Sequence, residues 1–439
     1  MNKTADEAHS GMGYSLQHGT WYEATACPSA PRDPLTETVS ADVCVVGAGL
    51  AGLTTALELC RGGELVALVE ANSIASGASG RNGGFVAAGF AEDLSRIIRR
   101  VGLERARALY DLSRAGVEYV REQIRILDPA IRMGDGCLAV LRYRDDDECI
   151  RHVSFARDEL GHDLEFWSVD DVREVLRTPR YHSAVFEPDA FHIHPLNYAL
   201  ALANEVERNG GRIFEGTPGL RLDRTPTGFE LTTPQGRIAA GRVVLCTGAA
   251  RGLVPALSRA ILPVATHVVV SSSAPGLIDR SIRTFAAIAD TRRAGDYYRI
   301  VDGNRLLWGG KITTRQSPPA RLTDVMRNTV TSVYPQLGPI EIEYAWSGLM
   351  SYCLHKMPVI GELEPGVWAA TGFGGHGLNT TAMAGCLIAS AVVEGDDRWR
   401  QFSSYGPVWA GGLFGRLGVQ LSYWWMQARD YRDERRGDG

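Results

Sequence analysis

A glycine pattern near the start of the chain constrains the fold most strongly. Gly47, Gly49 and Gly52 lie between the apolar run DVCVV and the segment LAGLTTALELC, whose apolar residues recur at helical spacing. A Gly-Gly pair ends that segment, and a second apolar run, LVALV, leads into Glu70. Strand, helix, helix stop and strand in this order predict one βαβ unit of about 30 residues.

Each position of this pattern has a mechanical role in binding a dinucleotide. The first glycine permits a tight turn, the second lets the backbone approach a pyrophosphate, and the third allows close packing of helix on strand. The helix N-terminus presents free N–H groups to the phosphates, and the acid accepts hydrogen bonds from ribose hydroxyls. The alternative is a tight turn beside an unrelated surface Glu. The predicted cofactor contacts are Gly47, Gly49, Leu50, Ala51, Gly52, Glu70 and Ala71.

Further glycine-rich segments favour FAD over NAD. The stretch 76–84, SGASGRNGG, is a small polar loop that can lie against a planar ring system. Near the C-terminus GFGGHG opens a second helix, whose amides would face the negative charge of a reduced flavin; a bland Gly-rich turn is the alternative. With the Gly-containing turn after GRVVLC, the expected contacts are Ala78, Ser79, Gly80, Arg81, Asn82, Gly83, Gly84, Thr247, Gly248, Gly372, Gly374, Gly375, His376, Gly377, Leu378 and Asn379.

Length and composition exclude several classes of protein. The 439 residues suffice for two or three domains, and apolar and charged fractions of 45% and 22% are those of a globular protein. A net charge of −5 and the lack of a dense basic block argue against a nucleic-acid partner. Eight cysteines without a CxxC spacing, no leader pattern and no apolar stretch of about 18 residues predict a cytoplasmic protein without membrane association.

The rest of the chain divides into a middle and a tail. Short alternating runs between residues 130 and 340, such as CLAVLRY and YYRIV, predict antiparallel strands with a few helices. The tail ends in YWWMQARDYRDERRGDG, whose apolar part is flanked by arginines. A packed or surface-lying helix is favoured there over a membrane anchor.

Taken together, these segments resemble the glycine/D-amino-acid oxidase (DAO) family of flavoproteins. The resemblance rests on DVCVVGAGLAGL, GASGRNGG, LCTGA, MPVIG and GFGGHGLNTT, and the WYEATA arm is similar to the gamma-glutamylputrescine oxidase branch. It covers about residues 20–400 and implies an α/β fold with a Rossmann-type FAD-binding domain and a second, α+β substrate domain built on an antiparallel sheet. The expected division is an arm at 1–39, FAD-binding segments at 40–110, 190–255 and 340–395, substrate segments at 111–189 and 256–339, and a helical tail at 396–439.

The chain also departs from this family. Where sarcosine oxidases carry a cysteine that binds flavin covalently, the register counted back from Gly361 places Gly348, and Cys353 is five residues away. We therefore expect noncovalent FAD. At the position of a lysine that follows the glycine-rich turn in sarcosine oxidases, this chain has Asn379.

Candidates for catalysis are few, because flavin-dependent amine oxidation needs little beyond a C–H bond aimed at flavin N5. Of 46 basic residues only three are Lys, and Lys311 ends a predicted strand that the resemblance places beside the flavin; a solvated strand end is the alternative. His376 is a second candidate, with ordering of its turn as the alternative, and Tyr298 is a third, with core packing as the alternative.

The remaining histidines give no sign of a metal site. His192 and His194 have the spacing of a metal pair, but we interpret His194 as the residue that begins a helix, and no metal is expected. His355 and Lys356 precede MPVIG, where cofactor contact and an exposed turn stay open as alternatives.

The resemblance implies an FAD-dependent oxidoreductase that oxidises a C–N bond of an amine or amino acid to an imine by hydride transfer to flavin N5. The expected partners are a small amine and O2, which yields hydrogen peroxide. A quinone-linked amino-acid dehydrogenase, a noncatalytic or RNA-modifying flavoprotein on the same fold and an NAD-dependent dehydrogenase are the alternatives. The identity of the amine and the oligomeric state do not follow from the residues.

Overall fold

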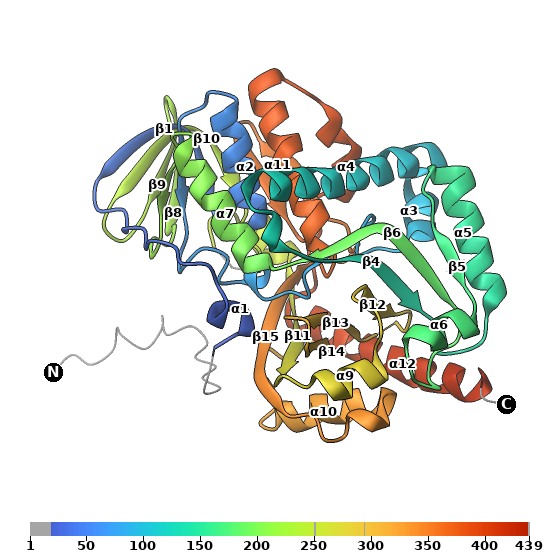
Figure 1. The fold of residues 1–439 in the computed structure, drawn as a ribbon. Helices are drawn as coiled ribbons and strands as arrows, with labels where there is room; N and C mark the ends of the chain where they lie inside the picture. Colours follow the sequence, from blue (N-terminus) through green and yellow to red (C-terminus); the bar gives the residue numbers. More distant parts are fainter. Residues whose placement is uncertain (1–18, 250–251, 294, 438–439) are drawn as a thin grey trace.

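The computed structural model describes residues 19–249, 252–293 and 295–437. Two β-sheets and the helices on their faces make up this part of the chain (Figure 1). Of the expected N-terminal arm, residues 1–18 lie outside the described residues, as do residues 438–439 of the expected tail.

The first sheet, sheet A, grows from the predicted βαβ unit. Its strands lie in the order β16-β17-β10-β1-β2-β7, and all neighbours are parallel except β16 and β17. An antiparallel pair, β8 and β9, extends it from β10. The strands are β1 Thr38–Val46, β2 Val66–Val69, β7 Arg212–Phe214, β8 Arg221–Thr225, β9 Gly228–Thr232, β10 Arg237–Leu245, β16 Val359–Glu364 and β17 Val367–Thr371.

Helices cover one face of sheet A. α2 packs on α11 and α7, and α4 crosses α11 (Figure 1). The crossing is close because Gly116 of α4 has no side chain where a Cβ would overlap the carbonyl oxygen of Asn379. On this face lie α2 Leu50–Arg61, α4 Leu103–Leu127, α7 Pro195–Arg208 and α11 Gly377–Glu394, with α3 Leu94–Val101 beside α4. α8 Pro255–Ala260 packs on the opposite face. Among the described helices, α11 has the length and mean hydropathy of a membrane span, and 61% of its apolar window is buried inside the protein.

The second sheet, sheet B, is antiparallel apart from the pairing of β12 with β4. Its strands lie in the order β15-β11-β14-β13-β12-β4-β6-β3, and β5 pairs with β6. The strands are β3 Phe85–Val86, β4 Arg132–Val140, β5 Glu165–Trp167, β6 Ala184–Ile193, β11 Leu262–Ser271, β12 Ala287–Asp290, β13 Tyr297–Val301, β14 Arg305–Thr313 and β15 Ile342–Tyr352.

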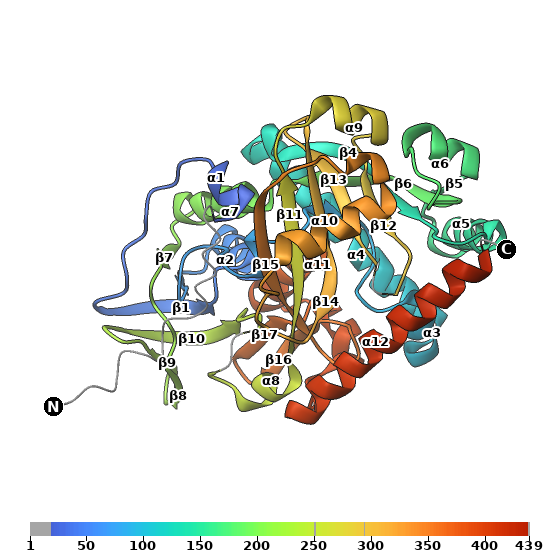
Figure 2. The ribbon, with the colours of Figure 1, turned by 90° about the horizontal axis from the view of Figure 1, so that it is seen from below.

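The two faces of sheet B belong to different cores. Side chains such as Val268 and Trp346 join the core shared with α2 and α11, whereas Val269 and Trp308 pack under α9 and α10 in a second core. The remaining helices are α1 Trp21–Ala24, α5 Asp146–Leu160, α6 Val169–Val175, α9 Pro275–Ser281, α10 Leu322–Val333 and α12 Gly412–Gly437, with short 3₁₀ turns at Ala78–Gly80, Pro129–Ile131, Pro335–Leu337 and Arg398–Tyr405. α12 runs along the outside of the molecule as a long surface helix (Figure 2).

The predicted fold class is confirmed: a parallel α/β sheet carries the dinucleotide turn, and a second, mainly antiparallel sheet lies beside it. Two of the expected domain boundaries do not coincide with the division of the chain between the two sheets. The cut at 110 falls inside α4, which packs with α11, and the FAD-binding segment from 340 includes β15, which is an edge strand of sheet B. An apolar strand carries no local mark of the sheet it joins, so the sequence could not assign β15.

Candidate functional site

The turn between β1 and α2 has the geometry that its glycines predicted. Gly47 has φ +106°, and a Cβ there would lie 2.6 Å from the carbonyl oxygen of Cys246, which directly follows β10. A Cβ at Gly52 would overlap the carbonyl oxygen of Gly47. Neither position accepts a side chain, so the glycines let the first turn of α2 approach the ends of β1 and β10.

Polar groups gather at the N-terminus of α2. Glu70, at the end of β2, accepts hydrogen bonds from the backbone N–H of Ala48 at 2.8 Å and of Asn72 at 2.9 Å. The Ser79 hydroxyl accepts a hydrogen bond of 3.0 Å from the N–H of Leu50, the first residue of the helix. The acid and the loop 76–84 are thereby both fixed against the helix N-terminus, where the helix dipole favours negative charge.

The loop 76–84 is held from within by one side chain. The Asn82 amide donates to the carbonyl oxygens of Ala78 at 3.2 Å and Ser79 at 2.8 Å, and its side-chain oxygen accepts from Gly84 N–H at 2.8 Å. Apart from its neighbours in the chain, no described atom lies within 4 Å of a Cβ built at Gly77, the second residue of this loop. The same holds at Gly248 and Gly377, so the backbone is open beside three of the predicted cofactor segments.

One face of β15 lies opposite these segments. The Trp346 indole N–H donates to the carbonyl oxygen of Arg81 at 3.0 Å, and a Cβ at Gly348 would lie 3.5 Å from that same oxygen. Two residues further, the Met350 sulfur lies 3.6 Å from a Cβ built at Gly375. Tyr352 follows in the alternation, with its hydroxyl 3.0 Å from the same built Cβ.

Alternate residues of one strand of sheet B therefore face the loop 76–84 and the turn before α11. The sequence analysis does not single out Met350 or Tyr352. The period-2 alternation along β15 is the signal that could have found them. Burial raises the pKa of the Tyr352 phenol, which keeps it protonated and able to donate a hydrogen bond.

The turn before α11 is tied to the segment that follows β3. His376 Nε2 lies 3.1 Å from the carbonyl oxygens of both Ala87 and Ala88, which makes this nitrogen the protonated one. Burial lowers the pKa of its imidazole, so the ring is neutral. The Asn379 amide donates to the carbonyl oxygens of Gly89 at 3.2 Å and Ser113 at 3.3 Å. These hydrogen bonds order the turn, which is the role that the sequence analysis gives as the alternative for His376.

The two remaining catalytic candidates differ in their surroundings. Lys311 is exposed and has φ +56°, at the point where the pairing of β14 with β11 shifts register. Asp296, which directly precedes β13, is buried near this strand end, and desolvation raises the pKa of its carboxyl to about 6, while the Lys311 charge acts in the opposite direction.

The structure places Tyr298 away from the site. Its ring is fully buried in the second core, stacked on Trp308 at 4.1 Å, and its hydroxyl shares a 2.7 Å hydrogen bond with that of Tyr334. The adjacent Tyr297 points to the opposite face of β13, where its ring lies 2.7 Å from a Cβ built at Gly83. Successive strand residues point to opposite faces, and the pair Tyr297-Tyr298 gives no indication of which faces the loop.

A buried cation that the sequence did not single out lies beneath the loop. Arg299 is fully buried, and its guanidinium donates to His192 Nδ1 at 2.6 Å, the Tyr22 hydroxyl at 2.9 Å and the Ile193 carbonyl at 2.8 Å. Burial, together with the Arg299 charge, lowers the pKa of His192 to about 3, so the ring is neutral and accepts. A Cβ at Gly84 would lie 2.9 Å from the Arg299 Cζ.

The N-terminal arm completes this network. Tyr22, in α1, is fully buried and donates its hydroxyl hydrogen to the carbonyl oxygen of Asn82 at 2.8 Å. Its ring meets Trp346 edge to face at 5.6 Å. Tyr22 therefore anchors the arm directly on the loop 76–84.

Other flagged residues have structural partners. His194 begins α7 and accepts from Asn197 N–H at 3.1 Å, as predicted. His355 accepts from Met357 N–H and is buried. Cys353 is buried, its sulfur lies 2.6 Å from a Cβ built at Gly372, and burial raises its thiol pKa to about 12. Across the described residues, no group of three His, Cys, Asp or Glu side chains could hold a metal ion.

Comparison with known proteins agrees with this geometry. The family model described as FAD dependent oxidoreductase (DAO) matches residues 42–391. The chain belongs to this family of FAD-dependent oxidoreductases. The gamma-glutamylputrescine oxidoreductase of Escherichia coli is 31% identical over 389 residues, which cover 88% of this chain and 91% of that protein. A probable oxidoreductase of Haemophilus influenzae, OrdL, is 31% identical over 402 residues, 88% of this chain and 92% of that protein.

Solved structures share the fold of this family member. The crystal structure of glycine oxidase from Geobacillus kaustophilus superposes with a TM-score of 0.71 at 23% identity, over 84% of this chain and 99% of that chain. The resemblance stated from the motifs is confirmed, and so are FAD as the cofactor and oxidoreductase as the enzyme class.

Proposed function

We propose that this enzyme oxidises a C–N bond of a small amine or amino acid to an imine, with noncovalently bound FAD and with O2 as the acceptor that yields hydrogen peroxide. FAD, when bound, supplies the hydride acceptor for the C–H bond next to nitrogen. The observation that carries the proposal is the meeting of Trp346, Met350 and Tyr352 on β15 with the glycine-rich segments 76–84 and 372–377. A substrate and a flavin ring both need that boundary between the sheets.

The chain's own groups fit FAD. Glu70 directly follows β2 beside the open turn and keeps unshared carboxylate lone pairs for ribose hydroxyls. The N-terminus of α2 favours a pyrophosphate, and Gly77 and Gly377 leave the backbone open to a ring. Arg299 adds a buried positive charge beneath the loop, which favours negative charge above it.

His376 and Tyr352 bear on how the substrate loses its proton. The oxidation removes a hydride from carbon and one proton from nitrogen, which together turn the amine into the imine. His376 donates its Nε2 hydrogen to two carbonyls, and the Tyr352 phenol is protonated, so neither is a general base near neutral pH. We expect the substrate to react as the neutral amine, so the rate rises with pH until the bound amine has lost its ammonium proton.

Lys311 is proposed as the group that assists oxygen. It is exposed at the end of β14, and its ammonium is a point charge that can stabilise negative charge developing on O2. We expect the enzyme to work in the cytoplasm.

The test is an anaerobic reduction screen on the purified holoenzyme. Bleaching of the visible flavin bands is followed with gamma-glutamylputrescine, free polyamines, glycine, N-methyl amino acids, and D- and L-amino acids. The first of these is included because the Escherichia coli relative is named for it. Bleaching by one class of amine supports the proposal and names the substrate. A flavin that none of them reduces contradicts it.

A further inference from the structure

The C-terminal helix α12 exposes a long apolar face. Leu413 and Phe414 are 80% and 85% exposed, and Trp424 and Trp425 are 57% and 58% exposed. With Leu417 and Leu421 these side chains recur at the three- and four-residue spacing of one helix face, and the preceding Val408 and Trp409 are exposed as well. A contiguous apolar surface of this kind marks a site of contact with a protein or a membrane.

The orientation of this face is fixed by contacts on the opposite side of the helix. Tyr423 is buried, and the Gln420 side-chain oxygen accepts from the Thr313 hydroxyl at 2.9 Å and from Thr314 N–H at 3.0 Å. Asp430 pairs with Arg293 at 2.8 Å. The apolar face is therefore held outward by the fold.

Charge on the helix is divided in the same way. Besides Asp430, the acidic residues Asp433 and Glu434 pair with Arg293 at 3.0 Å and Arg142 at 3.2 Å. The stretch 412–428 contains no acidic residue and a single basic one, Arg416. Among the side chains that the structure describes after this stretch, the exposed charged ones are Arg429 and Arg432.

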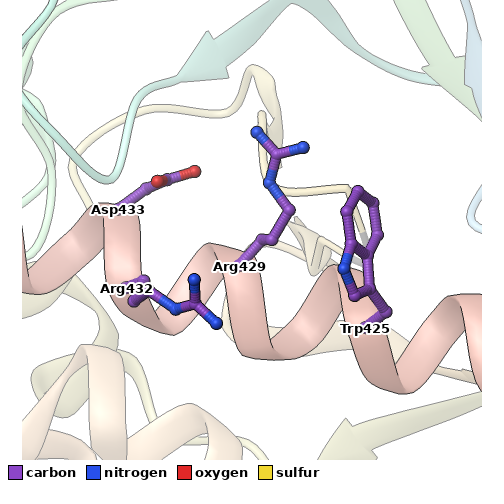
Figure 3. A pocket seen from close by; sticks show the side chains of 4 residues that line it. All are labelled: Trp425, Arg429, Arg432 and Asp433. Carbon is purple, nitrogen blue, oxygen red and sulfur yellow. The ribbon is translucent and has the colours of Figure 1, made fainter.

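Those two arginines line a shallow pocket of about 310 Å³ with Trp425 and Asp433 (Figure 3). The Arg429 guanidinium lies over the Trp425 ring, 4.8 Å from its centroid. Arginine side chains beside an amphipathic indole provide hydrogen-bond donors for a phosphate at the level where water meets hydrocarbon.

We propose that this face of α12 binds the surface of a bilayer that contains anionic lipids. Along the face the order is apolar residues 413–421, then Trp424 and Trp425, then Arg429 and Arg432. The apolar side chains would lie among the acyl chains, and Arg429 and Arg432 would reach the phosphates. A contact between two copies would instead favour an apolar centre with polar groups around the whole rim.

Binding in this orientation would bring the proposed catalytic site near the lipid. Gln420 accepts hydrogen bonds from Thr313 and Thr314, which follow Lys311 after one residue. Tyr423 lies close enough to Tyr352 on β15 for their charges to interact. The inner side of α12 therefore lies beside the end of β14 and the site face of β15. The membrane proposal itself holds whichever amine and whichever electron acceptor the enzyme uses.

The test is co-sedimentation of the full-length holoenzyme with vesicles. We expect binding to vesicles of phosphatidylcholine with phosphatidylglycerol, and weak binding to phosphatidylcholine alone. Each arginine near an anionic surface contributes about fivefold to partitioning, so the double variant R429Q/R432Q should bind roughly 25-fold more weakly. The matched control R208Q/R221Q removes two exposed arginines from α7 and β8 and should leave binding unchanged.

A second variant tests the apolar part. F414S/L417S should lower binding to both kinds of vesicle while FAD content and circular dichroism stay as in the wild type. Absence of sedimentation with anionic vesicles at low salt would overturn the proposal. So would binding that the arginine variant does not weaken, or a dimer in light scattering that F414S/L417S dissociates while vesicles capture neither form.

Discussion

Replacing Tyr22 with Phe removes one hydroxyl group from the network beneath the loop 76–84. That hydroxyl accepts from the Arg299 guanidinium at 2.9 Å and donates to the carbonyl oxygen of Asn82 at 2.8 Å. The ring packing against Trp346 is retained in the variant. The change therefore isolates the polar connection between the arm, the buried cation and the loop.

The magnitude follows from what is left unpaired. Arg299 is fully buried, so the hydrogen bond it loses is to a charged group and is worth about 1.5 to 3 kcal/mol. The Asn82 carbonyl loses a partner as well, but the loop can relax toward solvent. We expect the free energy of unfolding to fall by about 2 to 3 kcal/mol. If about 1.4 kcal/mol of this loss destabilises the conformation in which the loop binds FAD, the Kd for FAD rises about tenfold.

Urea unfolding of the apoprotein and fluorescence titration with FAD measure both quantities. Tyr198→Phe is the matched control, because Tyr198 is buried and its hydroxyl has no hydrogen-bond partner within the described part of the chain. That variant should be as stable as the wild type or more so. If Tyr22→Phe and Tyr198→Phe behave alike, the network does not hold the loop.

Four further outcomes are expected. Glu70→Ala should weaken FAD binding by about 1 to 3 kcal/mol, and wild-type retention in equilibrium dialysis would remove Glu70 from the ribose site. Acid denaturation should release the flavin into the supernatant; a yellow pellet would point to a covalent tether, with Cys353 tested first. Lys311→Met should slow reoxidation by O2 about a hundredfold in stopped-flow while flavin reduction stays within roughly tenfold, and equal rates in both half-reactions would make Lys311 a solvated strand end. Burial raises the pKa of Glu187 to about 7, so the folded state keeps this proton at pH values where the unfolded carboxyl has lost it. The free energy of unfolding therefore falls, by up to about 1.4 kcal/mol per pH unit, as the pH rises from the range of the unfolded carboxyl to about 7. In urea melts Glu187→Gln should abolish this fall, and an unchanged pH profile in the variant would refute it.

The parts of the site that the sequence predicted are those set by local geometry. Gly47 and Gly52 are needed by the backbone of one turn, and Glu70 follows from strand length and position. A short-range pattern contains the whole physical reason for these residues. The helix-beginning role of His194 was predicted for the same reason.

The parts that the sequence did not predict depend on contacts between distant segments. Tyr22 and Arg299 are 277 positions apart, and nothing near either residue indicates the other. The sequence analysis names Tyr298 as the candidate, but the two adjacent tyrosines differ only in the face of β13 on which each ring lies, and Tyr297 is the one on the side of the loop 76–84. Asn379 stays a predicted cofactor contact, and the hydrogen bonds of its side-chain amide to the carbonyl oxygens of Gly89 and Ser113 join segments that only tertiary structure brings near.

The most direct measurement of the proposed function combines reduction and turnover with one amine. Anaerobic addition of the best substrate from the screen should bleach the flavin bands completely. In air, the same amine should yield one hydrogen peroxide for each carbonyl compound formed by hydrolysis of the imine. A protein that binds no flavin after reconstitution, or a bound flavin that is not reduced by any amine or amino acid, would contradict C–N oxidation at this site.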